Sequence, residues 1–251
     1  MRIKAALTIT TVAAAFFAAN AAFGQVEPRI SKTAKPAQPV AVELFTSQGC
    51  SSCPPADNLL ARLAEIDGIV AISRPVTYWD RRGWKDTLAR EENTILQRAY
   101  AQRGLIGRGG VYTPQLVIDG QFGVIGSDIR QIVPMIQASS PAPAAIAVRP
   151  QKDGSVIIGL AGESSGPAEL VLVALKSHET VRVVRGENGN RALQYTNVLL
   201  NETAIADWNG GTADAKIPQA LLQQGGADRY ALLLRRKNAG PILAARKIPA
   251  Y

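Results

Sequence analysis

The sequence predicts two folded parts: an α/β domain over residues 39–140 and an all-β, antiparallel, sandwich-like domain over residues 144–251. Three observations support this division. In the first part, strand-like runs alternate with stretches that carry apolar residues at helical spacing. In the second part, short β-rich runs are separated by glycine-containing turns. Between the two, Ser139-Ser140-Pro141-Ala142-Pro143 has the composition of a domain boundary.

The first 24 residues have the pattern of a signal peptide. Arg2 and Lys4 precede an apolar run over residues 5–18, and small residues follow up to Gly24. The apolar run is shorter than the ~20 residues that a membrane-spanning helix needs. We therefore expect cleavage near Gly24, with an uncleaved N-terminal anchor as the alternative, and a periplasmic or secreted protein without stable membrane insertion. Residues 25–38 contain proline and charge without apolar periodicity, which predicts a linker.

The elements expected in residues 39–140 follow the order β-α-β-α-β-β-α. Leu59, Leu60 and Leu63 recur at helical spacing, and Asp119-Gly120 is a hairpin turn signal. The expected ranges are a strand at Val40–Thr46, a helix from Pro54 to about Ile66, a strand at Ile69–Val76, a helix at Glu91–Arg103, strands at Gln115–Ile118 and Gly123–Ile125, and a helix at Asp128–Gln137.

Short β-runs are expected throughout residues 144–251, and a polar segment around His178 is expected to form a hairpin tip. The runs are Ala145–Val148, Ser155–Leu160, Ala168–Leu175, Val181–Val184, Leu193–Leu199, Tyr230–Arg235 and Ile242–Ala245.

Cys50 and Cys53 are the two cysteines of the chain. A disulfide stabilises chiefly by closing a long loop of the unfolded chain, and a bridge across two intervening residues closes almost none. The Cys-Ser-Ser-Cys spacing therefore favours redox chemistry over a structural bridge. The motif follows a strand and precedes a helix, so Cys50 is expected to be an acidic nucleophilic thiol and Cys53 the more buried resolving thiol.

Two other uses of the cysteines are less well supported by the sequence. A closed zinc site needs four ligands, whereas the CxxC motif supplies two and the one histidine lies in the other predicted domain. Two thiolates can hold Cu(I), which leaves a copper carrier as an alternative. A further alternative is a binding module whose disulfide is structural and does not turn over. We expect no metal and no cofactor.

Four residues outside the motif are candidates for substrate binding. Thr113 and Pro114 precede a strand, where a cis peptide bond beside the cysteines would expose backbone to a bound peptide. Trp79 and Trp84 lie in a loop with interleaved charges and either line a substrate groove or cap the core. Glu43 is a secondary candidate as a buried proton acceptor, although strand alternation directs it away from its neighbour Leu44.

Several segments resemble known families. The β-Cys-x-x-Cys-α start and the later Thr-Pro resemble the thioredoxin superfamily. The segments VELFTSQGCSSCPPAD, YWDRRGWKD, QRAYAQRG, VYTPQLVIDG and GENGN are similar to the DUF1223 family of exported proteobacterial proteins. This resemblance implies a thioredoxin-like N-terminal domain, without implying a reaction. The chain departs from thioredoxins in having Gly49 before the motif, and from its narrower family in having Pro75-Val76-Thr77 where His-Val-Asp precedes Tyr-Trp-Asp.

Together these observations predict a periplasmic thiol–disulfide oxidoreductase. Its expected partners are protein or peptide thiols and disulfides, together with a separate partner that recycles the cysteine pair. Of the net charge of +8, residues 39–139 carry none and residues 140–251 carry +4, spread over that part without a cluster of Lys and Arg interleaved with aromatic residues. Nucleic acid is therefore not an expected partner.

Overall fold

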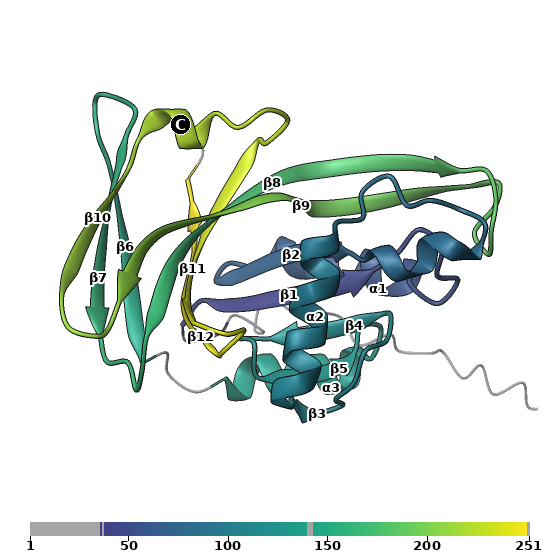
Figure 1. Ribbon diagram of the computed structural model, residues 1–251, viewed down its shortest axis with the longest axis horizontal. Coiled ribbons are helices and arrows are strands. Elements are labelled where there is room, and N and C mark those ends of the chain that lie inside the picture. The colour runs from purple at the N-terminus through teal and green to yellow at the C-terminus, as the bar shows by residue number, and fades with distance from the viewer. Residues whose placement is uncertain (1–35, 37, 140–142, 250–251) are drawn as a thin grey trace, which may run out of the picture.

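The computed structural model describes residues 36, 38–139 and 143–249, and consists mainly of strands (Figure 1). The predicted signal peptide and most of the predicted linker lie outside these residues. The helices are α1 (Pro54–Ala64), α2 (Glu91–Arg103) and α3 (Ile129–Ala138), with 3-10 helices at Thr77–Arg82 and Gln219–Leu222. The strands are β1 (Val40–Thr46), β2 (Ile69–Pro75), β3 (Ile106–Gly107), β4 (Gln115–Ile118), β5 (Phe122–Ile125), β6 (Ala144–Pro150), β7 (Val156–Gly162), β8 (Ala168–Val183), β9 (Arg191–Trp208), β10 (Ala213–Ile217), β11 (Arg229–Arg236) and β12 (Ile242–Ile248).

One mixed sheet of nine strands runs through both halves of the chain, in the order β12-β11-β8-β9-β2-β1-β4-β5-β3. The predicted fold class, a thioredoxin-like α/β domain followed by a separate all-β sandwich, is therefore wrong. The two halves join where β9 pairs with β2 in parallel, at Ser73 and Val198. The alternation of apolar residues predicts strands but carries no information on which strand covers the free edge of another.

Strands β8 and β9 form a hairpin whose strands have 16 and 18 residues, longer than most strands in globular proteins. Figure 1 shows this hairpin reaching from the small sheet to the opposite end of the molecule. His178 pairs with Thr196 in the middle of the ladder, so the predicted hairpin tip at this residue is wrong. The polar segment around His178 continues the strand because the distal hairpin extends past Leu175, the last β8 residue paired with β11.

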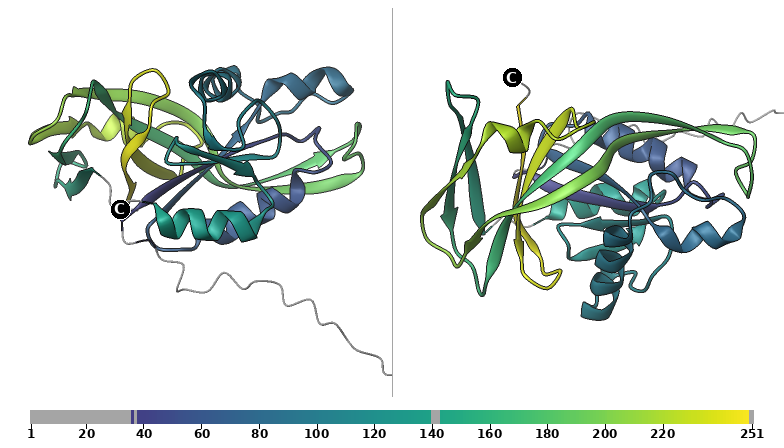
Figure 2. Two further views of the ribbon diagram at one scale, coloured as in Figure 1. Left: turned by 90° about the horizontal axis from the view of Figure 1, so that it is seen from below. Right: turned by 45° about the horizontal axis from the view of Figure 1, so that its top comes forward.

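The helices cover both faces of the sheet, with α1 and α3 on one side and α2 on the other (Figure 2). β1 is central, and its run Val-Ala-Val-Glu-Leu-Phe-Thr is buried on both faces. Val42 and Leu44 pack against Leu60 and Leu63 of α1 in one core cluster. Phe45 belongs to the opposite face, where it packs edge-on against Tyr100 of α2 with 6.1 Å between the ring centroids.

A second sheet of three strands, in the order β10-β7-β6, packs on the far part of the large sheet. Val156, Ile158 and Leu160 of β7 share a core cluster with Leu170 of β8 and Leu232 of β11. Their side chains alternate along each strand, as in other face-to-face sheet packings. This packing buries Ala168, Leu170 and Leu172, at the start of β8, in a core separate from the one that α1 covers.

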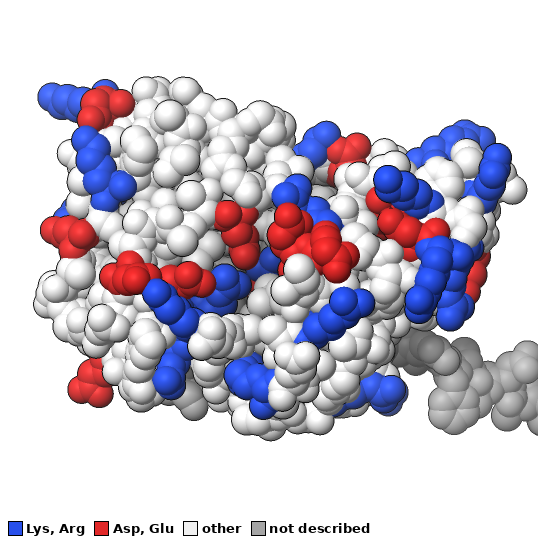
Figure 3. All heavy atoms as spheres, viewed as in Figure 1, with Lys and Arg blue, Asp and Glu red and all other residues white. Residues whose placement is uncertain are grey.

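No helix within residues 36–249 that the structure describes is long and apolar enough to cross a membrane. On the face shown in Figure 3, Lys and Arg side chains are interspersed with Asp and Glu over the whole width of the molecule.

Candidate functional site

Cys50 and Cys53 form a disulfide at the start of α1, with 5.4 Å between their Cα atoms. Cys53 is the N-cap residue of the helix, and Pro54 and Pro55 occupy its first positions. Proline is accepted there because the N–H groups of a first turn have no partner within the helix. The Cys53 N–H donates to the Cys50 carbonyl at 3.1 Å, which closes the short turn between the two cysteines.

Both cysteines are fully buried, whereas the two serines between them are exposed. The Ser52 hydroxyl lies 3.4 Å from Cys50 Sγ. The sequence predicts Cys53 as the more buried of the pair, but the structure shows the same burial for both. A reactant that approaches Cys50 from solvent meets the exposed Ser51 and Ser52 first.

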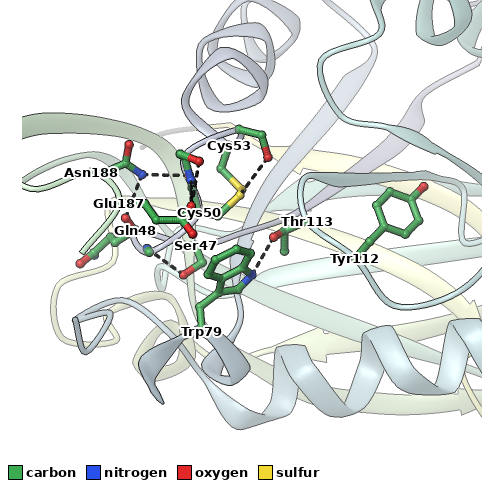
Figure 4. Close-up of a disulfide and its surroundings, with 12 residues drawn as sticks. Ser47, Gln48, Cys50, Cys53, Trp79, Tyr112, Thr113, Glu187 and Asn188 are labelled. Carbon is green, nitrogen blue, oxygen red and sulfur yellow. Dashed lines mark hydrogen bonds between the residues drawn. A yellow bond between two sulfur atoms is a disulfide. The ribbon is translucent and has the colours of Figure 1, made fainter. Parts of the chain in front are cut away.

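The Thr113–Pro114 peptide bond is cis, and the segment that contains it lies beside the disulfide (Figure 4). Trp79 links this segment to the cysteine loop, because its indole Nε1 donates to Thr113 Oγ1 at 2.8 Å. The same indole packs on Gly49, where an added Cβ would lie 3.4 Å from Trp79 Cβ. Gly49 therefore lies against Trp79, and a Cβ at this position would make an ordinary van der Waals contact with that side chain.

Trp84 and Asp86 hold the other side of the cysteine loop through Gln48. The Trp84 indole donates to Gln48 Oε1 at 2.8 Å, and the Gln48 backbone N–H donates to Asp86 Oδ2 at 2.8 Å. Trp79 and Trp84 are both half-buried, so each combines packing with exposed ring surface. The structure thus brings the predicted residues Trp79, Trp84, Thr113 and Pro114 together around the cysteine pair.

The tip of the β8–β9 hairpin also contacts the cysteine loop (Figure 4). The buried Asn188 amide donates to two backbone carbonyls, those of Gln48 at 3.0 Å and Cys50 at 2.9 Å. Glu187 Oε2 accepts from the Ser51 N–H at 3.1 Å and from the Ser51 hydroxyl at 2.7 Å. Neither tip residue was identified as functional from the sequence, although both belong to the GENGN segment noted there.

Asp57 is a buried acid one helical turn after Cys53. Its backbone N–H donates to the Cys53 carbonyl at 3.1 Å, so the two side chains lie on one face of α1. Burial raises the pKa of Asp57 to about 8; a contact with the Thr46 hydroxyl opposes this rise and the charge of Asp86 adds to it. Asp57 is therefore largely protonated at neutral pH, and its Oδ1 has no hydrogen-bond partner within the described part of the chain.

The hydroxyl of Tyr195, on β9, is buried and also has no hydrogen-bond partner among residues 36–249 that the structure describes. Burial raises the pKa of Tyr195, and the charges of Asp57 and Asp86 raise it further. Tyr195 therefore stays neutral near the two carboxyl groups. The sequence contains a signal for Asp57, namely an acid four residues after Cys53, whereas the approach of Tyr195 depends on the position of β9.

Glu43 lies on the other face of β1, away from α1. Its carboxylate accepts from Arg74 Nε at 2.6 Å and from the Tyr100 hydroxyl at 2.7 Å. Arg74 is itself fully buried and also contacts Glu202 of β9 at 2.5 Å. The structure therefore places Glu43 in a buried ion pair that joins β1, β2 and β9, rather than beside the cysteine pair.

A pocket of about 770 Å³ lies between the end of α1 and β11, and residues 48–53 contribute nothing to its lining. Within the described ranges, no group of three or more His, Cys, Asp or Glu side chains is placed to hold a metal ion. The disulfide and its surroundings therefore remain the site at which the predicted residues converge.

Comparisons with known proteins agree with the resemblance of the sequence to the DUF1223 family. The sequence matches the family described as "Protein of unknown function (DUF1223)" over residues 41–235, a range that contains both the cysteine loop and the hairpin tip. The crystal structure of protein AGR_C_4864 from Agrobacterium tumefaciens is similar, with 30% sequence identity and a TM-score of 0.73 over 85% of this chain and 95% of that chain. The search of curated proteins gave no significant match. Because the family match spans well over half of its length, this chain belongs to the DUF1223 family.

Proposed function

We propose that this protein carries out thiol–disulfide exchange through Cys50 and Cys53 in an oxidising compartment outside the cytoplasm. The observation that carries the proposal is a disulfide at the first turn of α1 with a buried carboxylic acid, Asp57, one turn later. A bridge between residues three positions apart closes too short a loop to contribute much stability. Redox chemistry accounts for the pair better than a structural role does.

Exchange begins when a substrate thiolate attacks Cys50 Sγ. The new sulfur–sulfur bond forms to Cys50, and the bond between Cys50 and Cys53 breaks with Cys53 as the leaving thiolate. A second substrate thiolate then attacks the substrate sulfur of the mixed disulfide, and Cys50 leaves. Two substrate thiols are thereby oxidised to one disulfide, and the cysteine pair gains two electrons. The reverse sequence reduces a substrate disulfide, and a thiol or disulfide partner restores the starting state.

In this reaction, Asp57 supplies the proton that the Cys53 thiolate takes up. A carboxyl group with a pKa of about 8 is protonated at neutral pH, so it can donate to the Cys53 thiolate as that sulfur leaves. In the reverse direction, the ionised carboxylate accepts the proton as Cys53 attacks the mixed disulfide. A group whose pKa lies near the working pH is suited to both directions.

Thr113 and Trp79 provide a surface for the substrate chain next to Cys50. The hydrogen bond between Trp79 Nε1 and Thr113 Oγ1 fixes the two loops that border the disulfide. Trp79 and Trp84 each keep part of the ring exposed, which offers apolar contact to a peptide. Since Cys50 is fully buried, the substrate must displace neighbouring side chains before its sulfur reaches Cys50 Sγ.

A binding module with an inert disulfide is the second candidate, and the complete burial of both cysteines favours it. Reactive cysteines are usually partly exposed, whereas structural ones are buried and inert. In this candidate function, the surface around Trp79 and Trp84 binds a partner, and the disulfide fixes the cysteine loop that contacts both tryptophans.

Trapping with glutathione disulfide separates the two candidates. In exchange chemistry, the Cys53→Ser variant should accumulate a mixed disulfide between Cys50 and one glutathionyl group, because its resolving thiol is absent. The Cys50→Ser variant serves as the matched control and should react much more slowly, since Cys53 is the resolving thiol. Mass spectrometry reports both products. Equal and negligible labelling of the folded variants would support the binding module instead.

A further inference from the structure

We infer that Glu187 tunes the reduction potential of the cysteine pair. Its carboxylate accepts a hydrogen bond from the backbone N–H of Ser51, which that N–H then cannot donate to a Cys50 thiolate. The inference rests on the proposed exchange function and identifies a residue that tunes it. Glu187 lies at the hairpin tip, 136 positions from Ser51 in sequence, and its Oε2 accepts from both the N–H and the hydroxyl of that residue. Ser51 directly follows Cys50, so the hairpin tip holds a carboxylate on the backbone of the residue next to the sulfur that becomes a thiolate.

Backbone hydrogen-bond donors are scarce at this end of α1, although the Ser52 hydroxyl lies 3.4 Å from Cys50 Sγ. Pro54 and Pro55 have no N–H, although they occupy the helical positions whose N–H groups would otherwise face an anion. The Ala56 N–H is bonded to the Cys53 carbonyl at 2.8 Å, and the Cys53 N–H is bonded to the Cys50 carbonyl. The Ser51 N–H is thus one of few backbone donors near Cys50, and Glu187 occupies it.

The direction of the effect follows from the charge of the reduced pair. Reduction adds two electrons and one proton to the disulfide, which leaves Cys53 as a thiol and Cys50 as a thiolate. A carboxylate held at the next residue repels this thiolate and occupies a neighbouring backbone N–H, so it disfavours the reduced form. Glu187 therefore makes the pair more reducing than the helix start alone would.

Two sets of contacts keep Glu187 charged and in place. Hydrogen bonds from the Ser51 hydroxyl and N–H lower the pKa of Glu187, so the carboxylate stays ionised at neutral pH. Asn188, the next residue, is buried and bound to the carbonyls of Gln48 and Cys50, which anchors the tip to the same loop. Arg82 Nη1 lies 3.6 Å from Glu187 Oε1 and offsets part of the charge.

Glu187→Gln tests the inference, because glutamine keeps an oxygen acceptor for Ser51 but removes the charge. We expect the glutathione equilibrium constant of the variant to move about fivefold towards the dithiol, which corresponds to a potential about 20 mV less negative. Glu179→Gln is the matched control: Glu179 lies on the same hairpin and pairs with Lys176, away from the cysteine loop. Its equilibrium constant should remain that of the parent protein.

Salt provides a readout that a purely structural role would not change. In about 1 M salt the Debye length is about 3 Å, so the difference between Glu187→Gln and the parent should fall below about twofold. Equal potentials of Glu187→Gln and the parent at low salt would overturn the inference, even if the pair exchanges readily. Failure of the exchange proposal would give a different result. In that case no mixed disulfide with glutathione forms on the Cys53→Ser variant, and this result does not depend on the potentials of the two glutamate variants.

Discussion

The side-chain amide of Asn188 donates a hydrogen bond of 2.9 Å to the backbone carbonyl of Cys50, across 138 positions of sequence. The same amide also holds the Gln48 carbonyl, so one buried side chain satisfies two carbonyls of the cysteine loop. The C-terminal half of the chain therefore forms part of the site. This contact ties the tip of the β8–β9 hairpin to the cysteine loop, in addition to the pairing of β9 with β2 that joins the two halves in one sheet.

Replacing Asn188 with alanine should leave the carbonyls of Gln48 and Cys50 buried without their donor. We expect the free energy of unfolding of the oxidised protein to fall by about 1–3 kcal/mol in urea titrations. In the reduced protein, Cys50 should also alkylate faster with iodoacetamide, because the tip no longer fixes its loop. Asn201→Ala, an exposed position on β9, is the control and should change the stability little. An Asn188→Ala protein as stable as the control would show that the tip does not hold the loop.

Asp57 should make the stability of the oxidised protein depend on pH. Its pKa is raised from 3.8 to about 8 on folding, so between about pH 4 and pH 8 the native state holds a proton that the unfolded state has lost. Stability should therefore decrease with rising pH, by about 1.4 kcal/mol per pH unit from this group. Asp57→Asn should remove that slope and be more stable than the parent near pH 8, with little difference near pH 4. Parallel stability curves for the two proteins would contradict the raised pKa.

Glu43 should matter for stability and not for redox chemistry. Glu43→Gln removes a buried charge from Arg74, which keeps Glu202 as a partner. We expect a loss of about 3 kcal/mol in the free energy of unfolding, at the lower end of the cost of breaking a buried pair, because Glu202 still compensates part of the Arg74 charge. Asp214→Asn, which breaks an exposed pair with Arg149, should cost less than about 1 kcal/mol. A changed potential of the cysteine pair in Glu43→Gln would show that Glu43 acts on the site after all.

The hydrogen bond between Trp79 and Thr113 can be isolated by a double-mutant cycle. Trp79→Phe and Thr113→Val each remove one partner of the same bond, so the double variant should lose about 1 kcal/mol less than the sum of the two single losses. The same variants should raise the KM for a peptide disulfide several-fold while changing kcat less. Strictly additive losses of stability would mean that the two loops do not depend on this bond.

Local elements could be predicted from the sequence because their signals are short-range. The helix over Glu91–Arg103 and the strands over Val40–Thr46 and Gln115–Ile118 have the predicted bounds. The sequence did not predict the short strands β3 and β10 or the full length of β8. The existence and length of these strands depend on pairing with distant strands, which the local pattern does not contain. For the same reason the pattern could not show that β9 pairs with β2, on which the fold class depends.

The site could be predicted only where its residues are close in sequence or carry a motif. The cysteine pair and Thr113–Pro114 follow from local patterns, and the structure places them together with Trp79 and Trp84. Asp57 lies four residues after Cys53, but the sequence also has an acid on the strand before the motif. That acid, Glu43, was the predicted candidate, and it faces the other side of the sheet. The contacts of Glu187 and Asn188 depend on the reach of the β8–β9 hairpin, which no local pattern determines.

The central claim is that Cys50 and Cys53 exchange with thiols, and the reduction potential of the pair tests it most directly. The protein is equilibrated with mixtures of glutathione and glutathione disulfide, quenched with acid and alkylated, and the dithiol fraction is measured by mass spectrometry. We predict a potential between about −120 and −270 mV, within the range of working thiol–disulfide exchangers. A potential below about −300 mV, together with a disulfide that does not react with glutathione in the folded protein, would contradict the proposal and make the bridge structural.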